Sequence, residues 1–355
     1  MKIIQLVPNI SMGDAVSNNC VAIKKLLKEE NIDSEIYAEV IDSRLPKDTA
    51  LPVSSMPRLK KDDILLYHYA VGCDMNDRLS SYGGKLVIQY HNITPEKYFS
   101  IYDKNSAAVC RRGRRQLVEL NQLPVKCLAD SEYNKQDLIE AGYKCPIDVC
   151  PILIPFEDYM RKPARQVQEK YTNDGYVNFL FVGRMVPNKK IEDVIKTFSW
   201  YQKNINAKSR LFLVGNTSME SYMKRLKDFI EKLKVEQVIF PGHISFAEIL
   251  AYYTIADVFL CMSEHEGFCV PLVEAMFFHV PVVARKTSAI PYTLGQSGFI
   301  LENNDPVEAA MACDRIINDA RIKKEIVKRQ DERLKDYSYQ TVKKRFLECM
   351  EDLLS

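Results

Sequence analysis

The chain has 355 residues, with 49 Lys and Arg against 47 Asp and Glu, so its formal net charge is +2. Hydrophobic residues make up 46% of it and charged residues 27%, which is ordinary for a globular protein and excludes disordered, collagen-like and disulfide-stapled chains. The near-neutral balance gives no overall electrostatic reason to bind nucleic acid. The length is typical of two domains.

The ten cysteines form no C-x-x-C pair and no Cys/His quartet at zinc spacing, so the sequence predicts no structural metal site. Several lie in apolar runs, where a free thiol behaves as a small buried hydrophobe, and we therefore expect a reducing, cytoplasmic compartment. The N-terminal segment MKIIQLVPNI fits a first core strand better than a signal peptide. No run reaches the roughly 18 apolar residues that a membrane span requires.

Short β-branched runs alternate with amphipathic stretches of helix length, which is typical of βαβ units with parallel sheets. In the first half, the predicted strands are 2–7, 63–69, 85–91 and 126–130. The predicted helices are 15–30, 107–122 and 132–141. Ser131 is expected to cap the last of these helices, and Gly142 to end it. Residues 151–177 hold three prolines among charged and turn residues, and we expect a linker there.

A second αβ series follows. Its predicted strands are 177–183, 210–215, 237–242, 256–262, 281–285 and 298–301. Its predicted helices are 190–206, 219–234, 245–254, 271–279, 305–319 and 321–335, and an amphipathic helix is expected over 338–354. Ser245 and Glu248 have the spacing of a capping box. We infer two Rossmann-like domains with a ligand cleft between them.

The segment SEHEGFCVPLVEAMFFHVPVVA (263–284) carries the most chemical information. A loop with Glu266 and Gly267 follows a strand, Pro271 is expected to open a helix, and Glu274 is expected in its first turn. A strand end that leads into a helix N-terminus is a natural phosphate site, and the two carboxylates can accept hydrogen bonds from sugar or ribose hydroxyls. The alternative for Glu274 is that it merely complements the helix dipole.

A second group of polar residues follows the strand 177–183. The sequence GRMVPNKK places Arg184 and Lys189 in the next loop, again at the carboxyl end of a strand. Two cations there can neutralise the charge that develops on a diphosphate leaving group without a metal. Taken alone, Lys189 is better explained as a solvated loop lysine, and it gains weight because it accompanies the Glu266 and Glu274 pair.

Together these segments resemble glycosyltransferase family 4, which comprises retaining nucleotide-sugar transferases of the two-domain GT-B fold. Glu266 and Glu274 match the family's E-x7-E motif, and GRMVPNKK is similar to its diphosphate-binding G-R-x-x-x-x-K loop. The resemblance covers about 178–302. Cys269 and His279 stand where glycine is common in the family. The chain also lacks the D-x-D pair of metal-dependent transferases of the other main fold.

The resemblance extends more weakly into the first half. SMGDAV (11–16) is similar to the loop that approaches the donor diphosphate, with Gly13 where many relatives have two glycines. HNITPEKYF (91–99) places His91 where the family has a histidine near the transferred sugar. The alternative is an ordinary polar residue at the edge of the core, because His68 and His243 have equivalent local contexts.

The resemblance implies an α/β GT-B protein. An acceptor-binding domain is expected over 1–155 with the returning helix 338–355, and a donor-binding domain over 156–337. The resemblance implies the following donor-binding residues: Gly13, Arg184, Lys189, Glu266, Gly267, Phe268, Cys269, Val270 and Glu274. The implied catalytic residues are Glu266, His91, Arg184 and Lys189. No cofactor and no metal are implied beyond the nucleotide-diphosphate sugar as co-substrate.

The implied reaction is retaining transfer of a hexose-type sugar to a saccharide or lipid-linked acceptor in cell-surface polysaccharide or glycolipid assembly. In CRRGRRQL (110–117) four arginines are candidates for contact with the acceptor or with the inner membrane, or simply for exposure to solvent. These are Arg111, Arg112, Arg114 and Arg115.

Other functions remain open at this point. The same architecture serves sugar phosphorylases and nucleotide-sugar epimerases, and a catalytically silent member can act as a nucleotide-sugar-binding scaffold. G-x-S-x-G and H-E-x-x-H are both absent, which disfavours a serine hydrolase and a zinc protease. No G-x-G-x-x-G follows either first strand, which disfavours a dinucleotide dehydrogenase.

Overall fold

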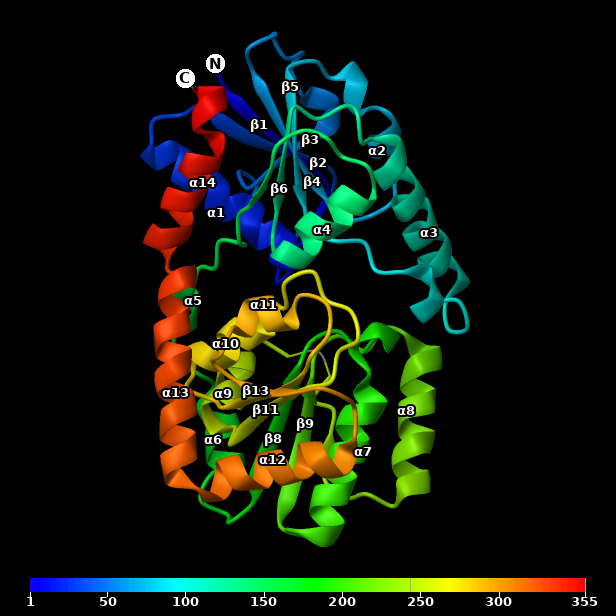
Figure 1. The fold of residues 1–355 in the computed structure, drawn as a ribbon, viewed down its shortest axis with the longest axis vertical. Coiled ribbons are helices and arrows are strands. Elements are labelled where there is room, and N and C mark those ends of the chain that lie inside the picture. The colour runs from blue at the N-terminus through cyan, green and yellow to red at the C-terminus, as the bar shows by residue number, and fades with distance from the viewer. Residues whose placement is uncertain (243, 355) are drawn as a thin grey trace. The chain divides into compact units, whose positions relative to one another are not determined.

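The computed structural model describes residues 1–242 and 244–354, which form two compact units (Figure 1). Unit 1 contains 1–100, 104–156 and the segment from Tyr337 onward, and unit 2 contains 101–103 and 157–336. The sequence analysis expects limits after 155 and after 337, whereas the compact units divide after 156 and after 336 and unit 2 also takes 101–103. His243, whose local context the sequence analysis compares with that of His91, lies outside the described residues.

Unit 1 is built on a seven-stranded sheet in the order β3-β2-β1-β4-β5-β6-β7, and every neighbouring pair is parallel. The strands are β1 (Ile3–Ile10), β2 (Ser34–Ile41), β3 (Leu51–Pro52), β4 (Ile64–Tyr69), β5 (Lys85–Tyr90), β6 (Lys126–Ala129) and β7 (Ile147–Val149). The four central strands β1, β4, β5 and β6 are almost wholly buried, as expected for a parallel sheet that helices cover on both faces.

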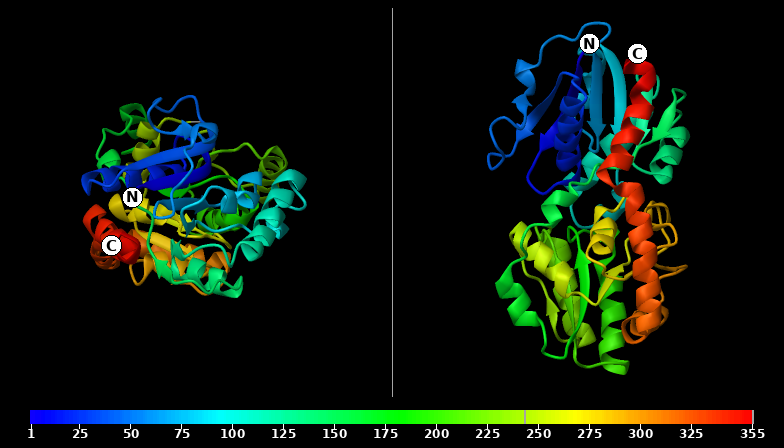
Figure 2. Two further views of the ribbon diagram at one scale, coloured as in Figure 1. Left: turned by 90° about the horizontal axis from the view of Figure 1, so that it is seen from above. Right: turned by 90° about the vertical axis from the view of Figure 1, so that its left-hand side faces the viewer.

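Helices cover both faces of this sheet. α1 (Ala15–Glu29) and α14 (Tyr339–Leu354) pack their apolar side chains on one face, and Figures 1 and 2 show α14 in red alongside the strands. α3 (Lys104–Glu119) and α4 (Glu132–Glu140), with the short α2 (Asp74–Asp77), lie on the other face. The final helix therefore completes the core of the first unit, as the sequence predicts.

Unit 2 repeats the arrangement with a six-stranded parallel sheet in the order β10-β9-β8-β11-β12-β13. The strands are β8 (Val177–Val182), β9 (Ser209–Val214), β10 (Val238–Ile239), β11 (Val258–Cys261), β12 (Val282–Arg285) and β13 (Phe299–Leu301). In both sheets the order reverses next to the first strand of the unit. This is the doubly wound pattern, so the expectation of two Rossmann-like α/β units is confirmed.

Two sets of helices enclose the second sheet. α7 (Ile191–Asn204), α8 (Glu220–Leu233) and α12 (Pro306–Asn318) share one core with one face of the strands. α6 (Arg165–Tyr171), α9 (Phe246–Ile255), α10 (Val270–Phe277) and α11 (Ile290–Leu294) share a second core on the other face. α13 (Ala320–Leu334) follows α12, and its Gln330 is fully buried. Among the described residues, none of the helices combines the length and the apolar character needed to cross a membrane.

The structure confirms both predicted caps. Ser131 accepts a hydrogen bond from the Asn134 amide at the start of α4, and Ser245 and Glu248 form a reciprocal capping box at the start of α9. The linker prediction for 151–177 is wrong in part, because that segment contains α5 (Phe156–Tyr159) and α6. α6 escapes a sequence reading because only Val167 is buried and the rest of the helix is polar.

Candidate functional site

The predicted site of unit 2 lies at the carboxyl ends of β8 and β11. These two strands are hydrogen-bonded neighbours in the sheet. In the chain, 75 residues, which include β9 and β10, separate Val182 at the end of β8 from Val258 at the start of β11. The loops that follow them, 183–190 and 262–269, therefore leave the same edge of the sheet at the point where the strand order reverses. Ligands of doubly wound sheets bind at this point.

Lys189 and Glu266 join these two loops. Lys189 Nζ lies 2.6 Å from Oε1 and 2.5 Å from Oε2 of Glu266, and their side chains are only 16% and 7% exposed. Burial alone lowers the pKa of Lys189, but the Glu266 carboxylate outweighs it and raises that pKa above its ordinary value. The pair is therefore a fixed ammonium–carboxylate pair, and Lys189 is no solvated loop lysine.

Backbone contacts hold the same two loops in register. The Asn188 side-chain amide donates to the carbonyl of His265 at 3.0 Å, and the Asn188 carbonyl accepts from the Glu264 amide at 2.8 Å. The Glu266 amide donates to Ser288 Oγ at 2.8 Å. Sequence reasoning missed Asn188 and Ser288 as positioning residues. Asn188 stands inside the quoted VPNKK segment, but a side chain that bonds a backbone 77 residues away leaves no local signal.

Arg184 lies two residues after the end of β8 and is exposed. Among residues 1–242 and 244–354 no carboxylate forms an ion pair with it, in contrast to Lys190, whose Nζ lies 3.0 Å from Glu264. The loop thus carries two lysines that are paired with carboxylates, of which Lys189 is buried, and one exposed arginine without a carboxylate partner among the described residues. An exposed guanidinium with five N–H donors is suited to phosphate oxygens.

Glu274 stands in the second turn of α10, not the first, because that helix begins at Val270 and its first turn holds no acidic residue. The explanation of Glu274 as a helix-dipole partner is therefore wrong. Instead, its Oε1 accepts from the hydroxyl of Tyr159 at 2.9 Å and its Oε2 from that of Tyr253 at 2.6 Å. Burial raises the pKa of Glu274, and the two hydroxyls oppose part of that rise. The tyrosines were missed because an apolar pattern marks them only as core.

The start of α10 has an unusual backbone. Cys269, its N-cap, has φ 73°, a left-handed conformation that favours glycine. His279, just after the helix, also has a left-handed φ of 55°. At these two positions the resemblance leads us to expect glycine, and the backbone at both is one that glycine adopts readily. The loop just before the helix is held by Thr293, whose hydroxyl donates a hydrogen bond to the carbonyl of Phe268. The helix itself begins at Val270.

Cys261 and Cys269 lie beside Glu266. The two Sγ atoms and a carboxylate oxygen of Glu266 all lie within 4.8 Å of one another, and all three residues are buried. The hydrogen bond from Cys269 lowers the pKa of the Cys261 thiol. The spacing C-x4-E-x2-C is no standard metal motif, so sequence patterns alone do not indicate this cluster.

Gly13 and His91, the predicted site residues of the first half, lie in unit 1. Gly13 has φ 76° in the turn between β1 and α1, where Asp14 caps the helix by accepting from the Ser17 amide. This is the glycine turn that the sequence predicts after the first strand. His91 follows β5, and its side chain is 2% exposed.

His91 is the middle of a buried hydrogen-bond chain. Gln5 Nε2 donates to the carbonyl of Cys20, so Gln5 Oε1 accepts from His68 Nε2 at 3.0 Å. Burial lowers the pKa of His68, which is therefore neutral, and its Nδ1 accepts from His91 Nε2 at 3.0 Å. His91 Nδ1 lies 2.7 Å from Asp130 Oδ2. Both ring nitrogens of His91 are thus engaged within unit 1, and a hydrogen bond from either nitrogen to a sugar requires that one of these bonds breaks.

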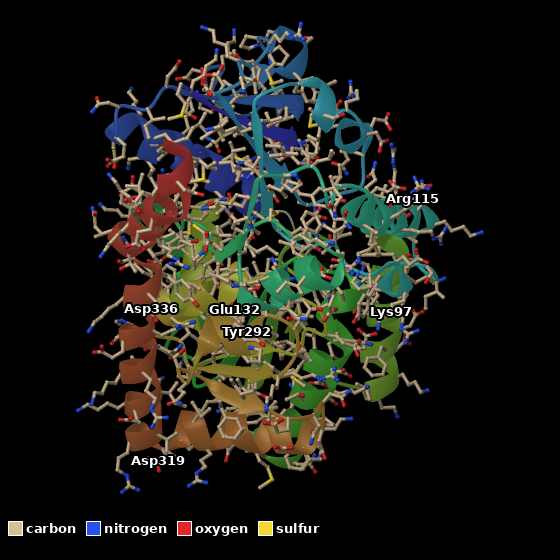
Figure 3. The ribbon with its side chains drawn as sticks, turned by 45° about the horizontal axis from the view of Figure 1, so that its top comes forward. Lys97, Arg115, Glu132, Tyr292, Asp319 and Asp336 are labelled. Atoms are coloured by element: carbon tan, nitrogen blue, oxygen red, sulfur yellow. The ribbon has the colours of Figure 1, made fainter. Side chains whose placement is uncertain are left out.

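The four arginines of α3 are all paired with carboxylates. Arg111 pairs with Glu96, Arg112 with Asp74 and Asp77, Arg114 with Asp137, and Arg115 with Glu119. Arg115, labelled in Figure 3, is 68% exposed. The arginines therefore form a charge-balanced helix surface and not an uncompensated basic patch.

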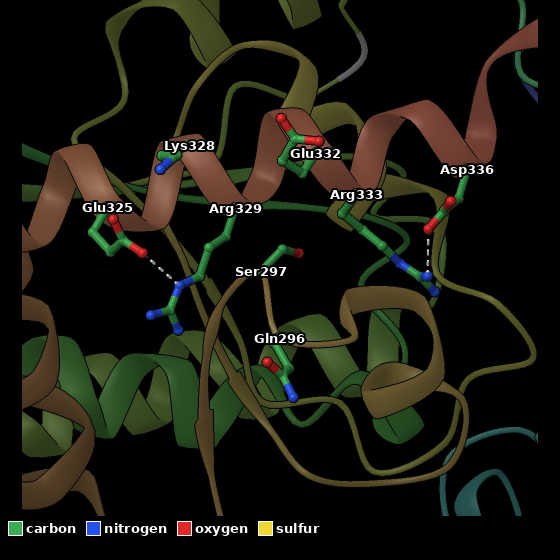
Figure 4. A pocket seen from close by; sticks show the side chains of 8 residues that line it. All are labelled: Gln296, Ser297, Glu325, Lys328, Arg329, Glu332, Arg333 and Asp336. Carbon is green, nitrogen blue, oxygen red and sulfur yellow. Dashed lines mark hydrogen bonds and ion pairs between the residues drawn. The ribbon is translucent and has the colours of Figure 1, made fainter.

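A depression on α13 is separate from these residues. It has a volume of about 490 Å³, and charged side chains such as Glu325, Arg329, Arg333 and Asp336 line it. Figure 4 shows that these groups pair with one another, Glu325 with Arg329 and Arg333 with Asp336. None of the predicted site residues lines this depression.

Comparison with known proteins identifies the family. The sequence model of the family "Glycosyl transferases group 1" matches residues 162–340, half of the chain. Over 179 residues the chain is 29% identical to the capsular polysaccharide biosynthesis glycosyltransferase CapM of Staphylococcus aureus, covering 49% of this chain and 45% of CapM. Over 184 residues it is 27% identical to the O-antigen chain mannosyltransferase B of Escherichia coli, covering 50% of this chain and 48% of that protein. The chain thus spans about half the length of these curated relatives.

Solved structures show the same fold over the full length. HepE of Anabaena in complex with UDP-glucose superposes with a TM-score of 0.77 at 18% identity, covering 99% of this chain and all of HepE. Sucrose-phosphate synthase of Thermosynechococcus elongatus superposes with a TM-score of 0.77 at 16% identity, covering 100% of this chain and 99% of that one. These likenesses confirm the GT-B fold. Together with the match of the family's sequence model, they show that the chain belongs to the group 1 glycosyl transferases.

Proposed function

We propose that the chain is a retaining glycosyltransferase of the family 4 type. It moves a hexose-type sugar from a nucleotide-diphosphate sugar to a saccharide or lipid-linked acceptor, and needs no metal for transfer. The observation that carries the proposal is the buried pair of Lys189 and Glu266 at the carboxyl ends of β8 and β11. It joins the two motifs that are separately only suggestive.

The diphosphate of the donor is proposed to bind Arg184 and Lys189. Arg184 is exposed and has no carboxylate partner among the described residues, so it can take phosphate oxygens without breaking an ion pair. Lys189 keeps its charge because Glu266 stabilises the ammonium. As the bond to the sugar breaks, negative charge grows on the leaving diphosphate, and two fixed cations stabilise that charge.

Glu274 and Glu266 are proposed to hold the two ends of the donor. The Glu274 carboxylate has about four acceptor positions, and the hydroxyls of Tyr159 and Tyr253 use two. The remaining positions are available to the ribose hydroxyls. Glu266, with the backbone of 267–270 at the start of α10, is proposed to hold the transferred sugar. Gly13 is proposed to lie against the diphosphate from unit 1.

Retention of configuration is proposed to follow from attack on the face that the diphosphate leaves, with the departing phosphate accepting the acceptor's proton. Among the described residues no side chain at this edge is assigned as a covalent nucleophile. The contact of His91 with the sugar remains a prediction, since both of its ring nitrogens are bonded within unit 1. Contact of the α3 arginines with the acceptor or with the inner membrane likewise remains a prediction.

The relatives support an acceptor of the polysaccharide class. CapM is named for capsular polysaccharide biosynthesis, and the second relative for O-antigen chain mannosyl transfer. HepE was solved with UDP-glucose, which supports a nucleotide-sugar as donor. Cell-surface polysaccharide or glycolipid assembly is therefore the proposed setting.

The decisive experiment is thermal stabilisation by a panel of UDP-, GDP- and ADP-sugars without added metal. A donor at 100 times its dissociation constant stabilises the protein by about 2.7 kcal/mol, which shifts a melting curve visibly. We expect one donor to give the shift in the wild type, and Glu274→Ala to lose it. Glu325→Ala is the matched control, because Glu325 lies on α13 in an exposed ion pair with Arg329.

Two results would contradict the proposal. The absence of a shift with every donor at millimolar concentration argues against a nucleotide-sugar site. Binding without turnover on a broad acceptor panel favours a silent scaffold instead. Where turnover is found, NMR of the product's anomeric proton decides whether configuration is retained, and release of a sugar phosphate in inorganic phosphate would indicate a phosphorylase.

A further inference from the structure

A cluster of two thiols and a carboxylate lies where β11 ends and α10 begins. Cys261 is the last residue of β11, Glu266 lies in the following loop, and Cys269 caps α10. Their ligand atoms lie within 4.8 Å of one another, and their exposed fractions are 1%, 6% and 8%. Among the described residues, no other set of three such groups gathers in this way.

The geometry fits a soft or borderline divalent cation. In a tetrahedral site with a Zn–S distance of about 2.3 Å, ligand atoms stand roughly 3.5–3.8 Å apart. The three atoms therefore need to approach one another by about 1.3 Å at most from a spread of 4.8 Å. Three protein ligands leave a fourth position for water. Two thiolates with one carboxylate select Zn²⁺ or Cd²⁺ over Mg²⁺, which prefers oxygen ligands.

The charges of the cluster also balance. With both thiols protonated, the metal-free cluster is neutral, because Lys189 neutralises the Glu266 carboxylate. When a divalent cation forms two metal–sulfur bonds, the two thiol protons leave to solvent, so two positive charges replace two. One oxygen of Glu266 can bind the metal while the other keeps Lys189, because a carboxylate offers about four acceptor positions. The buried site then stays neutral in both states.

The backbone supplies a further argument. Cys269 adopts a left-handed φ of 73°, which is unfavourable for an L-residue and readily adopted by glycine. The chain tolerates this strain and places a thiol against Cys261 and Glu266. A strained residue whose side chain completes a ligand set is typical of a functional site.

We propose that Cys261, Cys269 and Glu266 form a binding site for Zn²⁺ or a similarly soft divalent cation. The effect of this metal on activity rests on the proposed function: if Glu266 holds the donor sugar, a bound metal withdraws Glu266 from that sugar. The metal is then an inhibitor and not a cofactor, so transfer remains independent of metal.

The test is a titration of the reduced protein with Cd²⁺, followed by the ultraviolet charge-transfer absorbance of Cd–thiolate bonds. We expect one tight equivalent in the wild type, and its loss in Cys269→Gly, where glycine suits the backbone. Glu266→Gln is expected to weaken binding at least about tenfold, since even indirect ligand partners have effects of that size. An equal titration of wild type and Cys269→Gly would overturn the proposal.

The matched control is Cys127→Ala. Cys127 Sγ lies 3.6 Å from Cys145 Sγ in unit 1, so this variant also removes one thiol of a close pair, but from a pair outside the three-ligand cluster. This variant is expected to keep the one tight equivalent of Cd²⁺. Loss of that equivalent would mean that the metal binds the pair of Cys127 and Cys145 and not the three-ligand cluster.

A measurement on the wild type needs no variant. The ¹¹³Cd chemical shift is expected in the range of a metal coordinated by two sulfur ligands and oxygen. A chemical shift typical of all-sulfur or all-oxygen coordination would refute the site. The donor panel without metal is a separate experiment, so failure of the metal site and failure of the proposed transferase function are distinguishable.

Discussion

Glu274 is a half-buried carboxylate held by two tyrosine hydroxyls, and its pKa is raised by burial. Because the folded state binds this proton more tightly than the unfolded state, the contribution of Glu274 to stability is full below its ordinary pKa of about 4.5 and is lost as pH rises through the raised value. The stability of the wild type relative to Glu274→Gln should therefore fall between pH 4.5 and neutrality. Urea unfolding of both proteins across that range measures the difference in their free energies of unfolding. If this difference increases with pH, the hydrogen bonds from the two tyrosines outweigh burial in setting the pKa of Glu274.

His279 has a left-handed backbone just after α10, where glycine carries no Cβ penalty. Its side chain is 63% exposed and pairs with Asp331 at 3.2 Å, an interaction worth little in solvent. His279→Gly should therefore raise the free energy of unfolding by about 0.5–1 kcal/mol. Denaturant unfolding measures it. His279→Ala is the control, because it removes the imidazole and keeps the strain; equal stability of the two variants would locate the effect in the side chain.

At the scale of elements, α14 supplies core to unit 1 from the far end of the chain. Phe346 is 1% exposed and packs in one cluster with residues of α1 and the first sheet. Lys126 of β6 donates to the Cys349 carbonyl at 2.6 Å and contacts Asp352 at 2.5 Å, which fixes the helix end. Phe346→Ala should therefore cost about 3–5 kcal/mol of stability.

The comparison for that loss is Ile139→Ala on α4, since Ile139 is 47% exposed. We expect that variant to change the free energy of unfolding by less than about 0.5 kcal/mol. If urea unfolding gives similar losses for both variants, α14 contributes no essential part of the core.

The elements also show what the sequence made predictable. Strands such as β4 and β11 are continuous apolar runs and were placed within two residues, because complete burial leaves a clear pattern. β2 was missed: its Glu35 and Glu39 interrupt the apolar residues, and only its middle is buried. β3 and β7, of two and three residues, are too short to leave a pattern.

The candidate site shows the same division. Arg184, Lys189, Glu266 and Glu274 could be proposed from the sequence because each lies within a local motif. Their partners could not. Tyr159 reaches Glu274 across 115 residues, and only the fold decides that this tyrosine meets a carboxylate. The engagement of both His91 nitrogens and the pairing of the α3 arginines likewise depend on distant residues.

At the scale of the whole molecule, the two units have separate cores. Hydrogen exchange in mild urea should therefore reveal local stability unit by unit. In Phe346→Ala we expect faster exchange in segments of 1–100, 104–156 and 337–354, and unchanged exchange in 157–336. A uniform acceleration over both units would instead show that they unfold as one cooperative body.

The adjacency of β8 and β11 also has a kinetic consequence. Between them the chain forms α7, β9, α8, β10 and α9, so the loops carrying Lys189 and Glu266 meet only after this long segment has folded back. Closing such a separation costs chain entropy before any contact offsets it, and non-local parallel pairing is intrinsically slow. During refolding, helical circular dichroism should therefore recover before nucleotide-sugar binding does. A newly made chain would pass through a stage that is largely helical and still unable to bind the proposed donor.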